Sequence, residues 1–278
     1  MATCKTVRNV HWQRIVSALP LAAALLAAPL AFAAGEAPLL TPFSAAQGAQ
    51  APQPWRFTTL PNKTATRFEV VQEDGKRVLK VDSDQSYGNL VHATHLPLNA
   101  NATLGWRWRV DEFVEGADLR TRSGDDGAAK VCVFFDFPTD KLPVSERTRL
   151  ALARKATGED VPSEALCYVW DNKEAKGTAF ANAFTKRVRM FVLESGPASK
   201  PGTWVAERRN LLADYKRAFG DEAGDTAPDI VAIAISADSD NTHGHGIAYF
   251  TDVELHGGPS TQEAATTTQP KEKPTQGE

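Results

Sequence analysis

Two short segments carry arginines in a pattern that could bind a polar ligand. Residues 104–110 alternate apolar and cationic side chains, and residues 187–193 begin with two arginines at the same spacing of two. Since alternate side chains of a β-strand point to the same face, each arginine pair would lie on one face of its strand. If both strands belong to one sheet, acidic and aromatic neighbours could complete the face. The candidate ligand-binding residues are Arg107, Arg109, Asp136, Trp170, Asp171, Arg187 and Arg189.

A face of this composition suits a carbohydrate or another polar ligand. Guanidinium groups and carboxylates form hydrogen bonds with hydroxyl groups, and aromatic rings stack on the C–H faces of sugars. The alternative is a solvated sheet surface whose cross-strand ion pairs each contribute little stability. The sequence leaves both interpretations open.

Acidic residues in two turn-like segments suggest a metal site. Asp125 and Asp126 follow a glycine, and Asp238 and Asp240 lie in an Asp-Ser-Asp-Asn-Thr run that resembles a calcium loop. However, His243 stands where an EF-hand needs glycine, and no glutamate closes the loop. Asp and Asn are also favoured in turns for conformational reasons alone. A structural calcium ion therefore remains possible, with these four aspartates as candidate ligands, and no other cofactor is predicted.

No local motif predicts catalysis. The chain lacks a Gly-x-Ser-x-Gly elbow, a Ser-x-x-Lys pair, a His-Glu-x-x-His zinc motif, a phosphate loop and a dinucleotide fingerprint. A pair of carboxylates could still serve a glycoside hydrolase or lyase, because such a pair leaves no local signature. The preferred hypothesis is non-catalytic binding of a carbohydrate or other polar ligand. The alternatives are an enzyme acting on polysaccharide and a scaffolding protein of the cell envelope.

The elements that would position these residues are mostly short strands. In residues 104–110 the alternation places Trp106 and Trp108 on the apolar face, where we expect them to join the core. Residues 67–71 and 78–81 flank an Asp-Gly turn and predict a hairpin. Further strands are predicted at 90–94, 131–137, 166–171, 187–193, 230–235 and 248–255, and helices at 145–156 and 205–219. Many short strands with only two helices predict an all-β fold, an antiparallel β-sandwich of jelly-roll type.

The first and last parts of the chain differ from this domain in composition. A basic start, a charge-free apolar run over 15–32 and the small residues Ala31 and Ala33 predict a cleaved signal peptide, residues 1–33. We therefore expect an exported, periplasmic protein with no membrane span after cleavage. Residues 34–54 are predicted to be a linker, 55–256 a single domain and 257–278 a disordered tail.

Charge and cysteine content narrow the possibilities further. Asp and Glu outnumber Lys and Arg, 34 to 31, and loss of a basic signal peptide would widen that difference. Nucleic acid is therefore not an expected partner. Cys132 and Cys167 both lie in predicted strands. In an oxidising compartment they could form a disulfide, or they could be two buried thiols, and the sequence does not decide between these.

Several motifs occur in one order along the chain, and they include Trp106-Arg107-Trp108-Arg109-Val110, Gly124-Asp125-Asp126, Leu166-Cys167-Tyr168-Val169-Trp170-Asp171-Asn172, Arg187-Val188-Arg189-Met190, Glu194-Ser195-Gly196 and Asp238-Ser239-Asp240-Asn241-Thr242. Together these motifs resemble an exported bacterial family, the domain of unknown function 3047 family. The likeness extends over roughly residues 55–256, and it implies no established activity and no assigned catalytic residues. Two shorter patterns, at 74–81 and 248–255, resemble the first and last strands of galactose-binding-like jelly rolls, many of which are carbohydrate-binding modules. That looser likeness implies a jelly-roll fold.

Overall fold

The structure is a computed structural model that describes residues 38–158, 160–196, 202–220 and 227–257. These residues belong to one compact unit. The predicted signal peptide and nearly all of the predicted tail lie outside the described residues, so cleavage and export stay predictions. Within the described ranges, neither helix has the length and apolar character that a membrane span requires.

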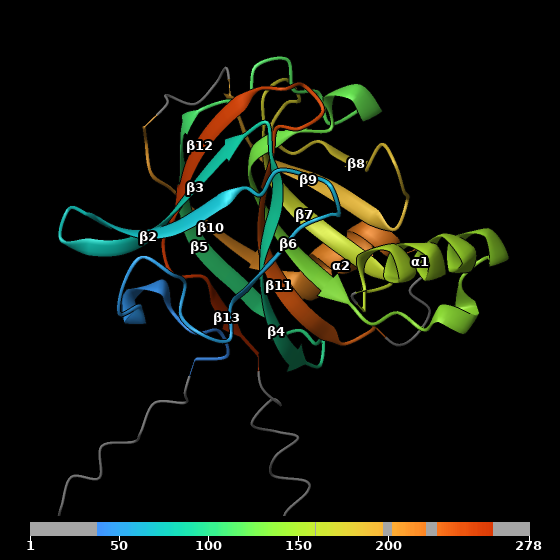
Figure 1. Cartoon of the computed structure of the whole chain (residues 1–278). Helices are drawn as coiled ribbons and strands as arrows, with labels where there is room; N and C mark the ends of the chain where they lie inside the picture. The colour runs from blue at the N-terminus through green and yellow to red at the C-terminus, as the bar shows by residue number, and fades with distance from the viewer. Residues whose placement is uncertain (1–37, 159, 197–201, 221–226, 258–278) are drawn as a thin grey trace, which may run out of the picture. The chain divides into compact units, whose positions relative to one another are not determined.

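Two β-sheets form the body of this unit (Figure 1). Sheet A has seven strands, in the spatial order β1 (Arg56–Thr58), β4 (Tyr87–Leu96), β11 (Ile230–Asp238), β6 (Gly127–Phe135), β7 (Glu164–Asp171), β9 (Val188–Ser195) and β8 (Ala179–Ala181). Sheet B has six, in the order β10 (Val205–Asn210), β5 (Thr103–Glu112), β12 (His245–Phe250), β3 (Lys76–Asp84) and β2 (Arg67–Glu73), with β13 (Glu254–His256) also paired to β5. All neighbouring strands are antiparallel except the parallel pair β7–β9. The predicted β-sandwich of jelly-roll type is confirmed.

The core lies between the two sheets and is rich in aromatic rings. Trp106 and Trp108 of β5 are buried, as the alternation predicted. The ring centroid of Trp106 lies 5.4 Å from that of Tyr168, and the ring centroid of Trp108 lies 5.6 Å from that of Trp170; Tyr168 and Trp170 are both on β7. Because fully buried aromatic side chains each remove a large apolar area from water, these contacts hold the two sheets together.

A smaller cluster covers the outer face of the β6–β7 part of sheet A. Cys132 and Cys167 stand directly opposite each other on these strands and form a disulfide, which settles the alternative that the sequence left open. Leu119, from the connection between β5 and β6, and Phe180, from strand β8, belong to the same buried cluster as the two cysteines. This second layer explains why β7 is buried along its whole length, a pattern typical of a strand covered on both faces.

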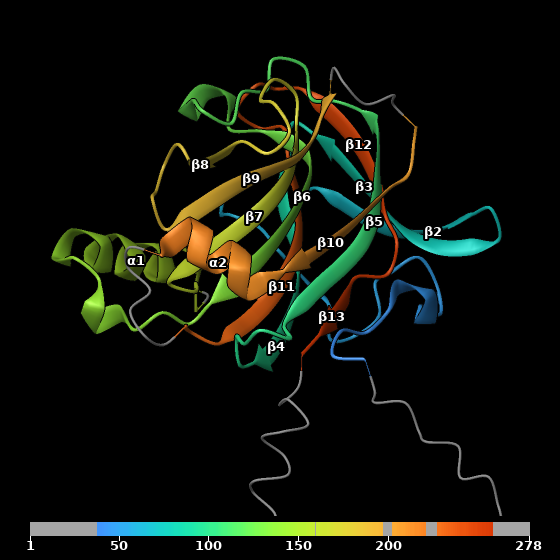
Figure 2. The ribbon, with the colours of Figure 1, turned by 180° about the vertical axis from the view of Figure 1, so that it is seen from behind.

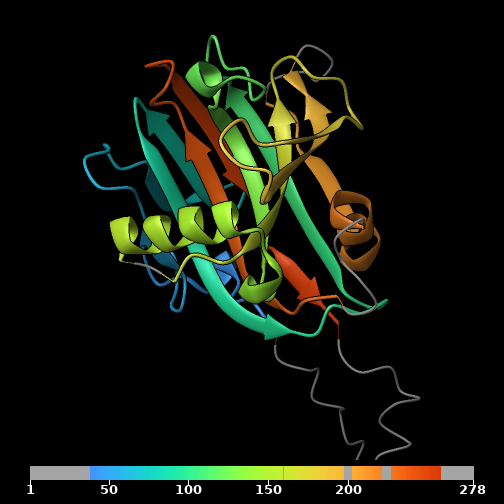
Figure 3. The same cartoon turned by 90° about the vertical axis from the view of Figure 1, so that its right-hand side faces the viewer.

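The two helices lie on opposite sides of sheet A (Figure 3). Helix α1 (Val144–Thr157) confirms the first predicted helix and has no buried residue. Helix α2 (Leu211–Phe219) continues from β10, crosses β7 on the inner side of sheet A (Figure 2), and buries Tyr215 against Phe135 at a centroid distance of 4.8 Å. The single helix predicted over 205–219 is wrong in its first part.

In that first part, residues 205–210 form the edge strand β10 instead. Their side chains alternate between half-buried and exposed, and they pair with β5 along their whole length. The helix begins only at Leu211, after Asn210 accepts a hydrogen bond from the backbone N–H of Ala213 through its side chain. Asn is a favoured residue at this capping position, and it marks the change from strand to helix.

The segment expected to be a linker, residues 34–54, is instead part of the fold over its described range, 38–54. Leu40 and Phe43 are almost completely buried in the main core. The ring of Phe43 packs against Trp55 at a centroid distance of 5.0 Å. The high Pro, Ala and Gln content therefore gave a wrong prediction, because two large apolar residues suffice to attach the segment.

Hydrogen bonds fix the same segment at defined points. The backbone N–H of Thr41 donates to Nε2 of His92 on β4, at 3.1 Å. The indole N–H of Trp55 donates to the carbonyl of Thr41, at 2.7 Å. At the other side, the backbone N–H and hydroxyl of Ser44 both donate to the carboxylate of Asp252. These contacts make the segment a structural strap across one end of the sandwich.

Candidate functional site

The predicted arginine face is divided between the two sheets. Arg107 and Arg109 lie on the outer face of sheet B, where both guanidinium groups lie over the ring of Trp204, at 5.7 and 5.2 Å from its centroid. Arg109 also lies over the ring of Tyr249, at 4.1 Å, and forms ion pairs with Glu73 and Asp111. This half of the prediction, arginines beside aromatic rings and carboxylates, is present, but with different rings from those expected.

The other two arginines lie on the inner face of sheet A, beneath α2. Arg187 donates to Oε1 of Glu164 at 2.8 Å, and the hydroxyl of Tyr215 donates to Oε2 of the same carboxylate at 2.8 Å. The guanidinium of Arg189 lies 5.4 Å from the ring centroid of Phe219. The condition for a shared arginine face, that both strands belong to one sheet, is therefore not met.

The remaining predicted ligand residues are also scattered. Asp136 is an exposed residue that follows β6, and its backbone N–H donates to the carbonyl of Asp229. Asp171 is buried at the end of β7, where its carboxylate accepts the backbone N–H groups of Lys173 and Glu174 and so closes a turn. Trp170 points into the core rather than to a surface.

The four aspartates considered for calcium already accept hydrogen bonds or ion pairs from protein groups. Asp126 accepts from the backbone and side chains of Asn241 and Thr242, and Asp125 from the side-chain amide of Asn182. Asp238 forms an ion pair with Lys130, and Asp240 forms one with Lys63. Within the described ranges, no group of three or more His, Cys, Asp or Glu side chains is arranged to hold a metal ion.

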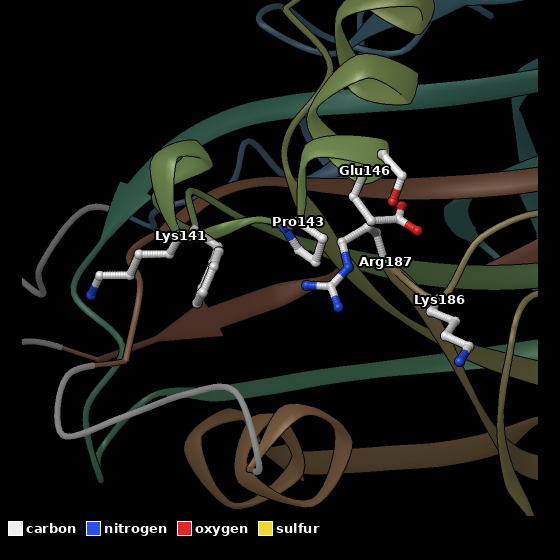
Figure 4. A pocket seen from close by; sticks show the side chains of 7 residues that line it. Lys141, Pro143, Glu146, Lys186 and Arg187 are labelled. Atoms are coloured by element: carbon white, nitrogen blue, oxygen red, sulfur yellow. The ribbon is translucent and has the colours of Figure 1, made fainter.

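Figure 4 shows a pocket of about 530 Å³ near the start of α1. Three of its residues are cationic, and they include the predicted ligand residue Arg187. Their side chains spread apart rather than converge on one point (Figure 4), so the pocket lacks the focused charge of an anion site. Its lining consists of Phe137, Lys141, Pro143, Ser145, Glu146, Lys186 and Arg187.

A different cluster, which the sequence analysis did not predict, lies between the two sheets. It includes two glutamates that face inward, one from β9 of sheet A and one from β10 of sheet B. Glu207 on β10 is paired in register with Trp106 of β5, and Glu194 on β9 is paired in register with Trp170 of β7. Trp108 packs against Trp170 and completes the group. We call these five residues the Trp–Glu cluster. Because register partners point to the same side of a sheet, both carboxylates lie on the inner side with the indoles.

Four polar atoms of the Trp–Glu cluster have no hydrogen-bond partner among the described residues. They are the Nε1 atoms of Trp106, Trp108 and Trp170 and the Oε1 atom of Glu207; the indole of Trp108 is nonetheless near enough to Glu207 to lower the pKa of its carboxyl group. The three tryptophans are at most 3% exposed. Buried indole N–H groups and carboxylate oxygens normally find a partner, because leaving one unpaired costs about 1–3 kcal/mol. Buried donors and a buried acceptor without such a partner therefore lie together in one cluster.

The two carboxylates of the cluster differ in their electrostatic surroundings. Burial, together with the nearby charge of Glu194, raises the pKa of Glu207 to about 7. Lys176, Arg209 and the indole of Trp108 oppose this rise without cancelling it. Glu194 forms an ion pair with Lys176, whose side chain is largely exposed. One carboxyl group is thus held near half-protonation at neutral pH, while the other faces a cation.

A network of hydrogen bonds braces the side of the cluster next to α2. Arg209, on the same side of β10 as Glu207, binds both carboxylate oxygens of Asp214 at 2.8 and 2.7 Å. The hydroxyl of Tyr168 donates to the same carboxylate at 2.8 Å. Burial and the neighbouring Asp214 hold the pKa of Tyr168 well above its ordinary value, so the phenol stays a donor. The network fixes β10 and α2 against sheet A.

Some signal for the cluster was present in the sequence. Glu194 lies in the Glu194-Ser195-Gly196 motif of the family resemblance, directly after a strongly apolar strand. Glu207 was assigned to a helix, and only the strand alternation of β10 turns it inward beside Trp106. The partnership of these two residues depends on which strands face each other, which no local pattern reports.

Comparison with known families identifies the chain at the level of its family. The model of the DUF3047 family, described as proteins of unknown function, matches residues 53–254, which span most of the chain. The chain belongs to this family. The match covers strands β1 to β12 and both glutamates of the Trp–Glu cluster. No curated protein matches the chain significantly.

Solved structures give only distant similarities to this DUF3047 protein. The carbohydrate-binding module TmCBM61, in complex with β-1,4-galactotriose, aligns with 74% of this chain and 90% of its own, at 10% identity and a TM-score of 0.33. Endoglucanase Cel12A from Rhodothermus marinus aligns with 73% of this chain and 92% of its own, at 10% identity and a TM-score of 0.36. At such low TM-scores these similarities carry no inference about ligand or activity.

Proposed function

We propose that this protein binds a carbohydrate at the Trp–Glu cluster. The observation that carries the proposal is the set of unpaired buried atoms, three indole N–H donors and one carboxylate oxygen, in one place. A hydroxyl group both donates and accepts hydrogen bonds, so a polyhydroxylated ligand can complete both kinds of atom at once. A ligand with only donors or only acceptors would leave one kind unpaired.

The position of Glu207 supports access from the surface. Its Oε1 atom is buried, but the residue as a whole is only half-buried on the edge strand β10. Lys176, 65% exposed at its side chain, lies in the connection from β7 to β8 and reaches Glu194 on the same sheet. These two residues would meet a ligand first, and the indoles beneath them would supply the donors that discriminate among hydroxyl arrangements.

Export completes the proposal. The predicted signal peptide would bring the protein to the periplasm, and the Cys132–Cys167 disulfide is of a kind that persists in oxidising compartments. We therefore place the binding event in the cell envelope, where polysaccharides are abundant ligands. A scaffolding protein would not need the unpaired atoms of the cluster.

A glycan array probed with the purified full chain tests the proposal, followed by calorimetric titration of the glycan that binds best. Glu207→Gln should lower the affinity roughly tenfold or more, since a hydrogen bond to a charged group contributes about 1.5–3 kcal/mol. Glu115→Gln, at an exposed position outside the cluster, is the matched control and should bind like the wild type.

Two results would contradict the proposal. One is an array on which no glycan binds the wild-type chain. The other is a glycan whose affinity is the same for the wild type, Glu207→Gln and Glu115→Gln. Thermal melts of the variants show in either case whether the fold is intact.

A further inference from the structure

We infer that Glu207 and Glu194 form an acid–base pair that hydrolyses a glycosidic bond of the bound carbohydrate. The inference rests on the proposed binding site and adds an activity to it. Its starting point is an arrangement of two carboxylates from different sheets on the inner side of the sandwich, each in register with a buried tryptophan.

The two members of the pair are unlike in a way that acid–base chemistry requires. Glu207 is half-buried beside the indole of Trp108, whereas Glu194 is ion-paired with Lys176. Burial favours the neutral form of a carboxyl group, and it does so for Glu207. The pKa of Glu207, raised to about 7, means that this group holds a proton in a large fraction of molecules at neutral pH. A carboxyl group that keeps its proton near neutral pH can act as the general acid of glycosidic cleavage, with a second carboxylate as base or nucleophile.

The unpaired atoms of the cluster suit the same role. A carboxyl oxygen of Glu207 that no described residue uses is available to a substrate oxygen. The indole N–H groups of Trp106, Trp108 and Trp170 can hold hydroxyl groups around the bond that breaks. The Arg209–Asp214 pair, braced by Tyr168, keeps β10 and therefore Glu207 in position.

The reaction balances with water as the co-reactant. Glu207 gives its proton to the glycosidic oxygen while the bond from that oxygen to the anomeric carbon breaks, and the bonding electron pair stays on the departing oxygen. Glu194 either takes a proton from the water that adds to the anomeric carbon or first forms an ester with that carbon, which water then hydrolyses. In both courses one water is consumed and a hemiacetal and an alcohol are released. In the ester course the ionised Glu207 takes the proton of the attacking water and so ends protonated; in the direct course Glu194 ends protonated, and exchange with solvent returns a proton to Glu207.

Release of reducing ends tests the inference, with the full chain and a panel of β-glucan, galactan, agarose, polygalacturonate and peptidoglycan. At least one polymer should be cleaved by the wild type. Glu207→Gln and Glu194→Gln should each lower kcat by about 10²–10⁴-fold, the usual effect of losing a positioned acid or base. Glu115→Gln should cleave at the wild-type rate. The value of kcat/KM should fall as the pH rises through about 7, because Glu207 must be protonated.

The outcomes separate this inference from the proposed function. If the wild type binds glycans but cleaves none of the five polymers, the activity is wrong and the binding site stands. If Glu207→Gln and Glu194→Gln cleave as fast as the wild type, the pair is not catalytic. If neither binding nor cleavage occurs, both proposals are wrong.

Discussion

Replacing Lys130 with methionine tests the electrostatic reasoning at a deeply buried ion pair of the sandwich. Lys130 of β6 donates to both carboxylate oxygens of Asp238 on β11, at 2.7 and 2.9 Å, and the two side chains are only 6% and 8% exposed. The backbone N–H of Gly127 donates to the same carboxylate at 2.8 Å. Methionine keeps most of the apolar stem but leaves Asp238 without its cation.

The expected loss is large at alkaline pH. Removing one partner of a buried pair costs about 3–5 kcal/mol, since the remaining charge is desolvated and uncompensated. For a domain of this size that corresponds to a fall of roughly 6–20 °C in Tm. The control is the double variant Lys130→Met/Asp238→Asn, which removes both charges and should recover most of the loss.

The same variant should be less unstable in acid. Burial raises the pKa of Asp238 to about 6 even with Lys130 present, and without Lys130 this pKa should rise further. A carboxyl group whose pKa is higher in the folded state binds its proton more tightly there, so acidification stabilises the fold. Below the raised pKa the variant should regain about 1.4 kcal/mol per pH unit.

Thermal melts at pH 8 and pH 5 measure both effects. A Lys130→Met variant that melts within a few degrees of the wild type at pH 8 would refute the assignment of a buried, charged pair. Equal losses at pH 8 and pH 5 would refute the titration of Asp238.

Three further predictions concern the strap and the disulfide. Deleting residues 34–54 should lower the free energy of unfolding by about 3–6 kcal/mol, from the loss of two buried apolar side chains, as measured by urea denaturation. Acidification should loosen the same segment, because burial lowers the pKa of His92 and its Nε2 must stay unprotonated to accept from Thr41. The stability that neutral His92 contributes is present above pH ~6.5 and is lost as the pH falls towards the folded-state pKa of His92. In thermal melts from pH 7.5 to 5, His92→Gln should flatten the dependence of Tm on pH. The double variant Cys132→Ala/Cys167→Ala should lose about 2–4 kcal/mol of unfolding free energy in the same denaturation assay. If a reductant leaves the unfolding free energy of the wild type unchanged, the bridge is not formed in solution.

The strands were predictable where one residue pattern had one physical cause. The alternation of residues 104–110 reported β5 correctly, because one face is buried and the other is not. The nearly continuous apolar run at 131–137 indicated β6 correctly, because a strand covered on both faces has apolar side chains on both. In contrast, the spacing of Leu211, Tyr215 and Phe219 is helical, and it predicts α2 correctly. Applying the same helical spacing to residues 205–210 gave a wrong prediction, because these residues form β10.

The candidate site was not predictable from local patterns, because strand order decides it. Arg107 and Arg189 look equivalent in sequence, yet one lies on the outer face of sheet B and the other beneath α2 on sheet A. Glu194 and Glu207 look unrelated in sequence, yet the pairings β7–β9 and β5–β10 bring them to the inner side beside buried indoles. Register between distant strands is set by packing of the whole core, which a single sequence does not display.

The most direct test of the proposed carbohydrate site is an NMR titration of the tryptophan indole N–H groups with oligosaccharides of the glycan that binds best on the array. Resonances of Trp106, Trp108 and Trp170 should shift, because these donors have no partner among the described residues. The resonance of Trp55, whose indole N–H already donates to the carbonyl of Thr41, should not move. Shifts confined to Trp204 would place the ligand on the arginine face of sheet B instead, and no shift in any indole would contradict the account.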